Sequence, residues 1–215
     1  MKTFKKYIIE MAPPANWDMN IFKQSFKKII EYANKNGKRL ASGSSRTVFE
    51  IPYENRPTVL KIAKNRKGLS QNMVEGDYGL YRMYPDITVP LIDVDEEYDE
   101  PRWIHLEKAD KITESQFKSI TGLEFKVFGK VLQDDEARRK GGKNSWQYNY
   151  LYKIPEDKIK QVKNSELFSD VTDLLGNFDL LAGDLTRINN WGLYKGKPVI
   201  IDLGFNEQVQ KEYYK

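Results

Sequence analysis

The chain has 215 residues, enough for one domain or two closely packed lobes with a hydrophobic core. Hydrophobic residues make up 40% and charged residues 31%, as in globular proteins, and the lack of cysteine excludes disulfides and thiolate chemistry. The net charge of +4 is too small to indicate a nucleic-acid binder. Glu10 interrupts the apolar start of the chain, and no apolar run approaches the roughly 20 residues of a membrane span. We therefore expect a soluble, cytoplasmic protein without an export signal or a membrane partner.

Hydrophobic periodicity and turn residues predict the secondary structure of the first half. The expected elements are, in chain order, a helix over 16–36, three antiparallel strands within 38–63, a helix over 71–83 capped by Ser70 and ended by Pro85, and two strands at 89–94 and 103–107. Together they predict a five-stranded antiparallel sheet accompanied by a helix.

The second half is expected to be mainly helical. Predicted here are a helix over 113–132, an irregular segment over 133–153, a helix over 165–182 and a hairpin over 191–202 with its turn at 195–197. A polar stretch at 106–110 marks the boundary between the lobes. The predicted organisation is an N-terminal extension and helix over 1–37, a first lobe over 38–108 and a second lobe over 109–215.

Three motifs of the first half suggest phosphate chemistry. In LASGSSRTVFEI, the small residues Gly43, Ser44 and Ser45 let backbone N–H groups approach phosphate oxygens, although an ordinary hairpin turn has the same pattern. Lys61 lies within the apolar strand TVLKIA, where a lysine is usually just solvated. Glu75 follows on the next helix and could pair with a buried lysine, although alone it would be taken as a surface residue.

Two motifs of the second half carry acids and an amide. In AGDLTRINNWG, Asp184 and Asn189 share one tight loop that could hold a nucleophile beside a metal ion, or they could serve only as turn or capping residues. In VIIDLG, Asp202 ends an apolar strand. A carboxylate there is costly unless a cation meets it, and magnesium prefers oxygen ligands of this kind.

Taken in this order, the five motifs resemble the protein-kinase-like fold over about residues 40–204. The chain is also similar to small kinase-like proteins of tailed bacteriophages, and its GDL loop is similar to that of aminoglycoside-type phosphotransferases. The resemblance implies an α+β, two-lobed protein with a five-stranded antiparallel N-lobe sheet plus a helix, and a reduced, mainly helical C-lobe. It implies ATP and Mg²⁺ as cofactors, and the cytoplasm of the host cell if a phage encodes the protein.

The resemblance also implies residue roles. Lys61 would contact the α and β phosphates, with Glu75 orienting it, and the turn of Gly43, Ser44 and Ser45 would cover the phosphates. Asp184 would be the catalytic base, while Asn189 and Asp202 would hold metal. Leu106 falls at the gatekeeper position, and the backbone of Glu107 and Ala109 would meet the adenine edge.

The chain departs from the family pattern at three places. Ala41 and Arg46 replace the first and third glycines of the phosphate loop, and Arg46 is expected to point into solvent, with a contact to phosphate as the alternative. Ala182 stands where the family has a catalytic-loop histidine. Only residues 205–215 follow Gly204, so we expect no activation segment and no usual peptide groove. The acceptor, whether a protein or a small molecule, is not indicated.

Two further features are explained more simply by a structural role than by a functional one. His105, the single histidine, has no second histidine or cysteine with which to bind metal and is expected to pack within its strand. The run from Arg138 to Lys143, with Trp146, Tyr148, Tyr150 and Tyr152, could bind nucleic acid, but most such runs are solvated loops.

The leading hypothesis is therefore an ATP- and magnesium-dependent phosphotransferase acting on a hydroxyl. The alternatives are a pseudokinase-like module that binds a nucleotide or a protein, such as a phage protein that targets a host factor or belongs to a particle, and a nucleic-acid-binding protein.

Overall fold

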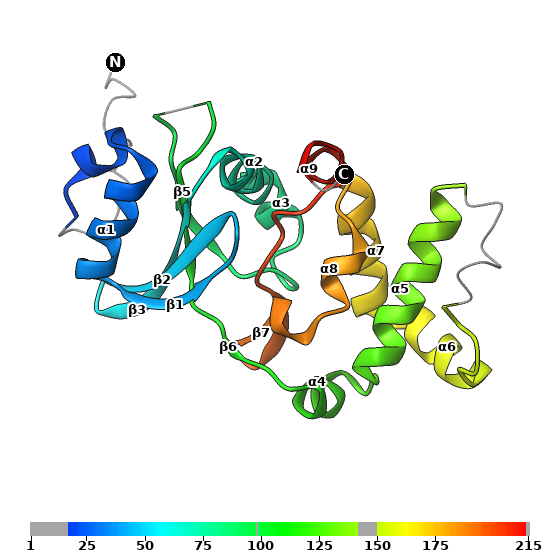
Figure 1. The fold of residues 1–215 in the computed structure, drawn as a ribbon. Helices are drawn as coiled ribbons and strands as arrows, with labels where there is room; N and C mark the ends of the chain where they lie inside the picture. The colour runs from blue at the N-terminus through cyan, green and yellow to red at the C-terminus, as the bar shows by residue number, and fades with distance from the viewer. Residues whose placement is uncertain (1–16, 98, 142–149, 214–215) are drawn as a thin grey trace, which may run out of the picture. The chain divides into compact units, whose positions relative to one another are not determined.

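The computed structural model describes residues 17–97, 99–141 and 150–213, and the chain divides into two compact units (Figure 1). Unit 1 comprises Met1–Gly76 and Leu91–Lys108, and unit 2 comprises Asp77–Pro90 and Ala109–Lys215. Unit 1 contains η2 (Met19–Lys23), α1 (Phe26–Asn36), β1 (Lys38–Ser42), β2 (Arg46–Tyr53), β3 (Arg56–Ala63), α2 (Arg66–Glu75), β4 (Leu91–Val94) and β5 (Trp103–Glu107). Unit 2 contains α3 (Tyr78–Met83), β6 (Asp110–Lys111), α4 (Glu114–Thr121), α5 (Phe125–Arg139), α6 (Glu156–Lys163), α7 (Glu166–Asn177), α8 (Ala182–Leu185), η4 (Ile188–Asn190), β7 (Trp191–Tyr194), β8 (Lys197–Ile200) and α9 (Glu207–Tyr213).

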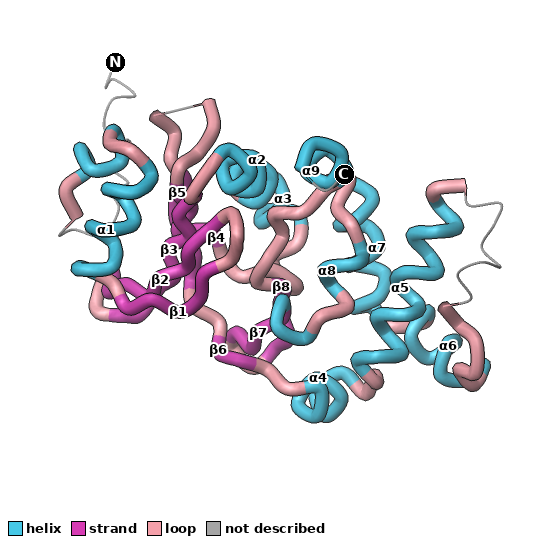
Figure 2. Tube along the Cα trace, in the orientation of Figure 1, coloured by secondary structure: helices cyan, strands magenta, loops and turns pink. Residues whose placement is uncertain are grey.

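The strands of unit 1 form one antiparallel sheet with the order β1-β2-β3-β5-β4 (Figure 2). The predicted α+β class with a five-stranded antiparallel sheet is thereby confirmed. The β2 and β3 strands pair along their whole length, and β3 also pairs with β5, so β3 is a central strand.

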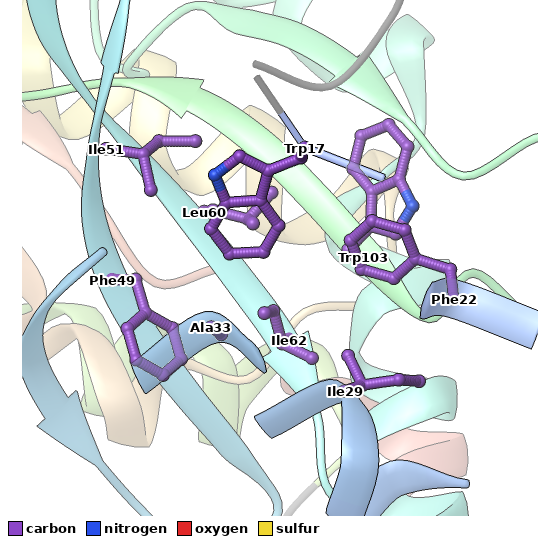
Figure 3. Packing of buried hydrophobic residues seen from close by; sticks show 9 residues of the cluster. All are labelled: Trp17, Phe22, Ile29, Ala33, Phe49, Ile51, Leu60, Ile62 and Trp103. Atoms are coloured by element: carbon purple, nitrogen blue, oxygen red, sulfur yellow. The ribbon is translucent and has the colours of Figure 1, made fainter. Parts of the chain in front are cut away.

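The two faces of this sheet are covered by different helices. Because side chains alternate along a strand, the first face carries large apolar residues of β2, β3 and β5, and α1 and η2 pack against it. Figure 3 shows this cluster, which consists of Trp17, Phe22, Ile29, Ala33, Phe49, Ile51, Leu60, Ile62 and Trp103. The second face carries Val48, Lys61 and Ile104, which are register partners, and α2 lies over this face. Lys61 therefore points toward the side of the sheet that α2 covers.

The N-terminal helix is shorter than predicted. The expected helix over 16–36 begins only at Phe26, because a separate 3-10 turn precedes it and Gln24 is extended between them. Asp18 caps that turn by accepting a hydrogen bond from the backbone N–H of Asn20. The guanidinium of Arg102 donates to the carbonyls of Phe22 and Gln24, which stabilises the break.

The prediction of one helix over 71–83 capped by Ser70 is wrong. Helix α2 already begins at Arg66, because Asn65 caps it through the N–H of Gly68, and Ser70 lies buried within the helix. It ends at Glu75, and Asp77 caps α3 as a new helix by accepting from the N–H of Gly79. Asparagine and aspartate compete well for such capping positions, and they set both boundaries.

In unit 2 the predicted helix over 113–132 is divided. A capping box of Thr113 and Gln116 starts α4, and Gly122 ends it in the left-handed conformation with φ 76°. The segment expected to be irregular from 133 continues α5 to Arg139, because Arg138 and Arg139 pair with aspartates one turn earlier. Residues 142–149 of that segment lie outside the described residues.

The remaining predictions for unit 2 hold in their main features. The helix expected over 165–182 forms as α7, which Ser165 caps, but it ends at Asn177. The predicted hairpin is confirmed as β7 and β8, with Lys195 and Gly196 both at positive φ, as a two-residue type I′ turn requires. With β6 they form a three-stranded sheet. Within the described ranges, no helix is both long and apolar enough to cross a membrane.

Candidate functional site

Lys61 and Glu75 form a buried ion pair in unit 1. Lys61 projects from the central strand β3, and Glu75 is the last residue of α2, which lies over the same face. The ammonium nitrogen of Lys61 is 2.5 Å from Oε1 of Glu75, and the two residues are 5% and 1% exposed. The pair joins the central strand of the sheet to the end of α2. The structure thus brings together the lysine and the glutamate predicted from the sequence.

Arg46 is buried, which corrects the expectation from the sequence. It was expected to point into solvent, but it is 7% exposed and its Nη1 lies 2.5 Å from Oε2 of Glu75. The same nitrogen lies 3.4 Å from Oδ1 of Asn72 on α2. Strand register explains this, because Arg46 pairs with Ala63 and so lies on the same face as Lys61, two residues away along β3. The alternation of side chains between the two faces along β2 and β3 is the sequence signal that predicts this position of Arg46.

The turn before Arg46 is fixed by side chains. The N–H of Gly43 donates to the carbonyl of Arg46 over 2.9 Å, which closes the turn. Ser45 is buried and its hydroxyl donates to Gln71 of α2 over 2.5 Å. The carbonyls of Gly43 and Ser44 accept from the side chains of Lys64 and Asn65, at 2.8 and 3.0 Å. The turn predicted to cover phosphates is therefore held in one conformation by the β3–α2 connection and by α2.

The residues predicted at the adenine edge lie where the chain leaves unit 1. Leu106 is buried in β5, and Glu107 is the last residue of that strand. The carboxylate of Glu107 accepts hydrogen bonds from Arg56, at 2.7 Å from Nη2 and at 3.1 and 3.2 Å from Nε. Ala109 is the first residue of unit 2 after Lys108. Adenine binding by the backbone of Glu107 and Ala109 stays a prediction.

Asp184 and Asp202 line one small cavity in unit 2. Its volume is about 10 Å³, close to that of a single water-sized sphere. Asp184 lies in the short helix α8, and Asp202 follows strand β8. The remaining lining is apolar and consists of Leu180, Leu181, Leu185, Leu203 and Phe205. Two acids from segments far apart in sequence thus meet at the same apolar-walled space.

Backbone hydrogen bonds hold these two segments together on either side of the acids. The N–H of Leu181 donates to the carbonyl of Phe205 over 3.2 Å. The N–H of Ile201 donates to the carbonyl of Asn190 over 2.9 Å. Because both contacts involve backbone atoms, the relative placement of Asp184 and Asp202 depends little on side-chain rotamers.

The loop after Asp184 is supported by buried groups. The indole N–H of Trp191 donates to the carbonyl of Leu185 over 2.9 Å. Thr186 packs against Gly129 of α5 so closely that a Cβ there would lie 3.2 Å from the Cβ of Thr186. A glycine at this position allows α5 and the loop to approach each other.

The two asparagines of the loop have different surroundings. Asn189, predicted to hold metal, lies in η4 and is exposed. The side chain of Asn190 donates to the carbonyl of Asp184 over 2.8 Å. Asn190 therefore supports the acid-bearing turn, a role that the sequence motif does not indicate because its pattern concerns only the first of the two adjacent asparagines.

Asp184 and Asp202 are residues that could contribute oxygen ligands to a hard cation. Carboxylate oxygens are suitable ligands for Mg²⁺, which commonly uses one or two carboxylates together with phosphate oxygens and waters. Across the described ranges, no group of three or more histidine, aspartate or glutamate residues is arranged to hold a metal ion.

The structure also describes His105 and part of the basic aromatic run. His105 is fully buried in β5, as predicted, and its Nε2 lies 2.7 Å from the hydroxyl of Thr58. Burial and the nearby positive charge of Arg56 lower the pKa of His105 from 6.5 to about 4. In the basic aromatic run, Arg138 and Lys140 are engaged by Asp134 and Glu136 on α5. Its members Lys143, Trp146 and Tyr148 lie outside the described residues.

Comparison with protein-family models finds no family that matches the chain. Comparison with curated proteins likewise finds no matching relative.

Proposed function

We propose that the protein is a two-lobed, kinase-like phosphotransferase that binds ATP with magnesium and transfers the γ-phosphoryl group to a hydroxyl. The observation that carries the proposal is the buried Lys61–Glu75 pair on the α2-covered face of a five-stranded antiparallel sheet. A lysine held by a glutamate in this way keeps its positive charge at a defined place until an anion arrives, which suits the α and β phosphates of a nucleotide. Unit 1 would be the first lobe, and Lys61 its main phosphate ligand.

The residues of unit 2 supply the groups that transfer needs. Asp184 would accept the proton of the acceptor hydroxyl as its oxygen forms a bond to the γ-phosphorus. The bond from that phosphorus to the β–γ bridging oxygen breaks, and ADP leaves with the electron pair. Asp202 and Asn189 would hold magnesium, which when bound neutralises charge on the phosphate oxygens. The cavity shared by Asp184 and Asp202 supports roles for both acids at one place.

Transfer can be tested with labelled nucleotide. The full chain is incubated with γ-labelled ATP, Mg²⁺ and cell lysate as the source of acceptors, and labelled products and ADP are measured. Asp184→Asn is expected to reduce transfer by about a hundredfold or more, the usual contribution of a general base. Asp202→Asn should reduce transfer by a comparable factor, because it removes a charged ligand of the magnesium that neutralises the phosphates. Asp173→Asn, at an exposed position of α7, is the matched control. Unchanged transfer by Asp202→Asn would refute the proposal.

The same assay separates the enzyme from a binding module. A pseudokinase-like module would bind ATP without transferring phosphate. The exposure of Asn189, in contrast to the packed Asn190, is the observation that favours this second candidate, since a metal ligand is usually oriented by its neighbours. Nucleotide binding with no labelled product in any lysate fraction would assign the protein to that class.

A further inference from the structure

The carboxylate of Glu75 forms ion pairs with two cations. Lys61 approaches Oε1 and Arg46 approaches Oε2, each at 2.5 Å, and all three residues are buried. The two cations reach the carboxylate from adjacent strands of the same sheet face. If a lysine is the only counter-charge of a buried glutamate, movement of that lysine leaves the carboxylate uncompensated, which is strongly destabilising.

We propose that Arg46 is a positioning residue that keeps Glu75 paired when Lys61 turns toward a nucleotide phosphate. This inference rests on the proposed function, because it assigns Lys61 to a phosphate. With Arg46 in place, Lys61 can shift from Glu75 to an anion without leaving a buried carboxylate uncompensated. Arg46 thereby reduces the free energy that phosphate binding by Lys61 would otherwise cost.

Arg46 is well held for this role. Its contact with Asn72 and the neighbouring Ser45–Gln71 hydrogen bond both join the start of β2 to α2. Arginine remains protonated at all physiological pH values, so the counter-charge is permanent. Arg46, which stands in place of a glycine of the kinase-like pattern, thus connects the turn of Gly43, Ser44 and Ser45 to the helix that carries Glu75.

Chemical labelling tests the competition for Glu75 without nucleotide. The full chain is treated with acetic anhydride, and the rate of acetylation of Lys61 is followed by mass spectrometry, with the exposed Lys27 as internal control. In Arg46→Met, Lys61 no longer shares the carboxylate of Glu75 with a second cation, so Glu75 holds its side chain more firmly and acetylation is expected to slow severalfold. Faster acetylation would indicate a merely loosened structure and would overturn the inference.

Calorimetric titration with ATP and Mg²⁺ tests the consequence for binding. Arg46→Met is expected to weaken binding by about tenfold, equivalent to about 1.4 kcal/mol, whereas Arg46→Lys retains a cation and should bind more tightly than Arg46→Met. Arg39→Met, exposed on β1, is the matched control. Unchanged affinity in Arg46→Met would overturn the inference.

A Glu75→Gln background distinguishes positioning from direct contact. A neutral amide needs no counter-charge, so adding Arg46→Met should then change the dissociation constant by less than about twofold. An equal loss in both backgrounds would assign Arg46 to the phosphate itself and would overturn the positioning role. If the unmodified chain binds no ATP with Mg²⁺, the proposed function fails, and that result is distinct from a failure confined to the Arg46 variants.

Discussion

The ammonium of Lys61 and the carboxylate of Glu75 lie 2.5 Å apart on the α2-covered face of the sheet. Lys61 lies in the central strand β3 and Glu75 at the end of α2, so the secondary structure fixes where the two backbones lie. Burial excludes water from the pair. A charge pair of this kind is weak evidence for stability, because desolvation offsets much of the attraction. Under the proposed function, the pair instead places a cation where the phosphates of a nucleotide would bind.

The two asparagines of the loop are expected to respond differently to substitution. Asn190→Ala removes the donor to the carbonyl of Asp184 and should lower the free energy of unfolding by about 1 kcal/mol. Asn189→Ala removes an exposed side chain and should leave stability unchanged while raising the Mg²⁺ concentration needed for phosphotransfer. Urea unfolding and a magnesium titration of activity measure the two effects. Equal stability of both variants would argue against the support role of Asn190.

Acid should destabilise the protein through its single histidine. The pKa of His105 is lowered to about 4 in the fold, so between pH 6.5 and 4 the unfolded chain binds the extra proton and stability falls as pH falls. The loss should approach about 3 kcal/mol. His105→Gln keeps a side-chain N–H donor and should flatten the difference in unfolding free energy between pH 7 and 5. An unchanged pH dependence in that variant would exclude His105 as the cause.

Two helical glycines form a matched pair. In α5, a Cβ at Gly129 would meet the backbone and side chain of Thr186 at 3.2 to 3.3 Å, whereas at Gly176 of α7 it would meet only the end of the Arg139 side chain at 3.4 Å. Gly176→Ala should therefore stabilise the protein by about 0.5 to 1 kcal/mol through helix propensity. Gly129→Ala should gain less or lose stability, because Thr186 and the loop after Asp184 must move. Denaturant unfolding measures both, and an equal gain would contradict close packing at Gly129.

The sheet and the Lys61–Glu75 pair could be predicted from the sequence. Alternating apolar residues fix which face each strand buries, and a lysine within such a strand must find a carboxylate if the face is covered. Arg46 was missed because alignment with a glycine-rich pattern assigned it to a turn. Its place in β2 puts it on the Lys61 face through strand register alone.

Helix boundaries were less predictable, because they depend on competing caps and local charge pairs. Ser70 is an acceptable cap by residue type, but Asn65 caps the helix earlier. The charged run after Leu132 was interpreted as irregular, yet the pairing of Arg138 and Arg139 with acids one turn earlier extends α5. The shared cavity of Asp184 and Asp202 also required the fold, because backbone contacts between distant segments create it.

The most direct measurement of the central claim is calorimetric titration of the full chain with ATP and Mg²⁺, repeated for Lys61→Met and for the exposed control Lys27→Met. The unmodified chain and the control should bind with equal affinity, and Lys61→Met should bind at least about tenfold more weakly. Each variant is first checked for an intact unfolding transition, so that lost binding is not confused with lost folding. No binding by the unmodified chain, or full affinity in Lys61→Met, would contradict the assignment of Lys61 as the phosphate-binding cation.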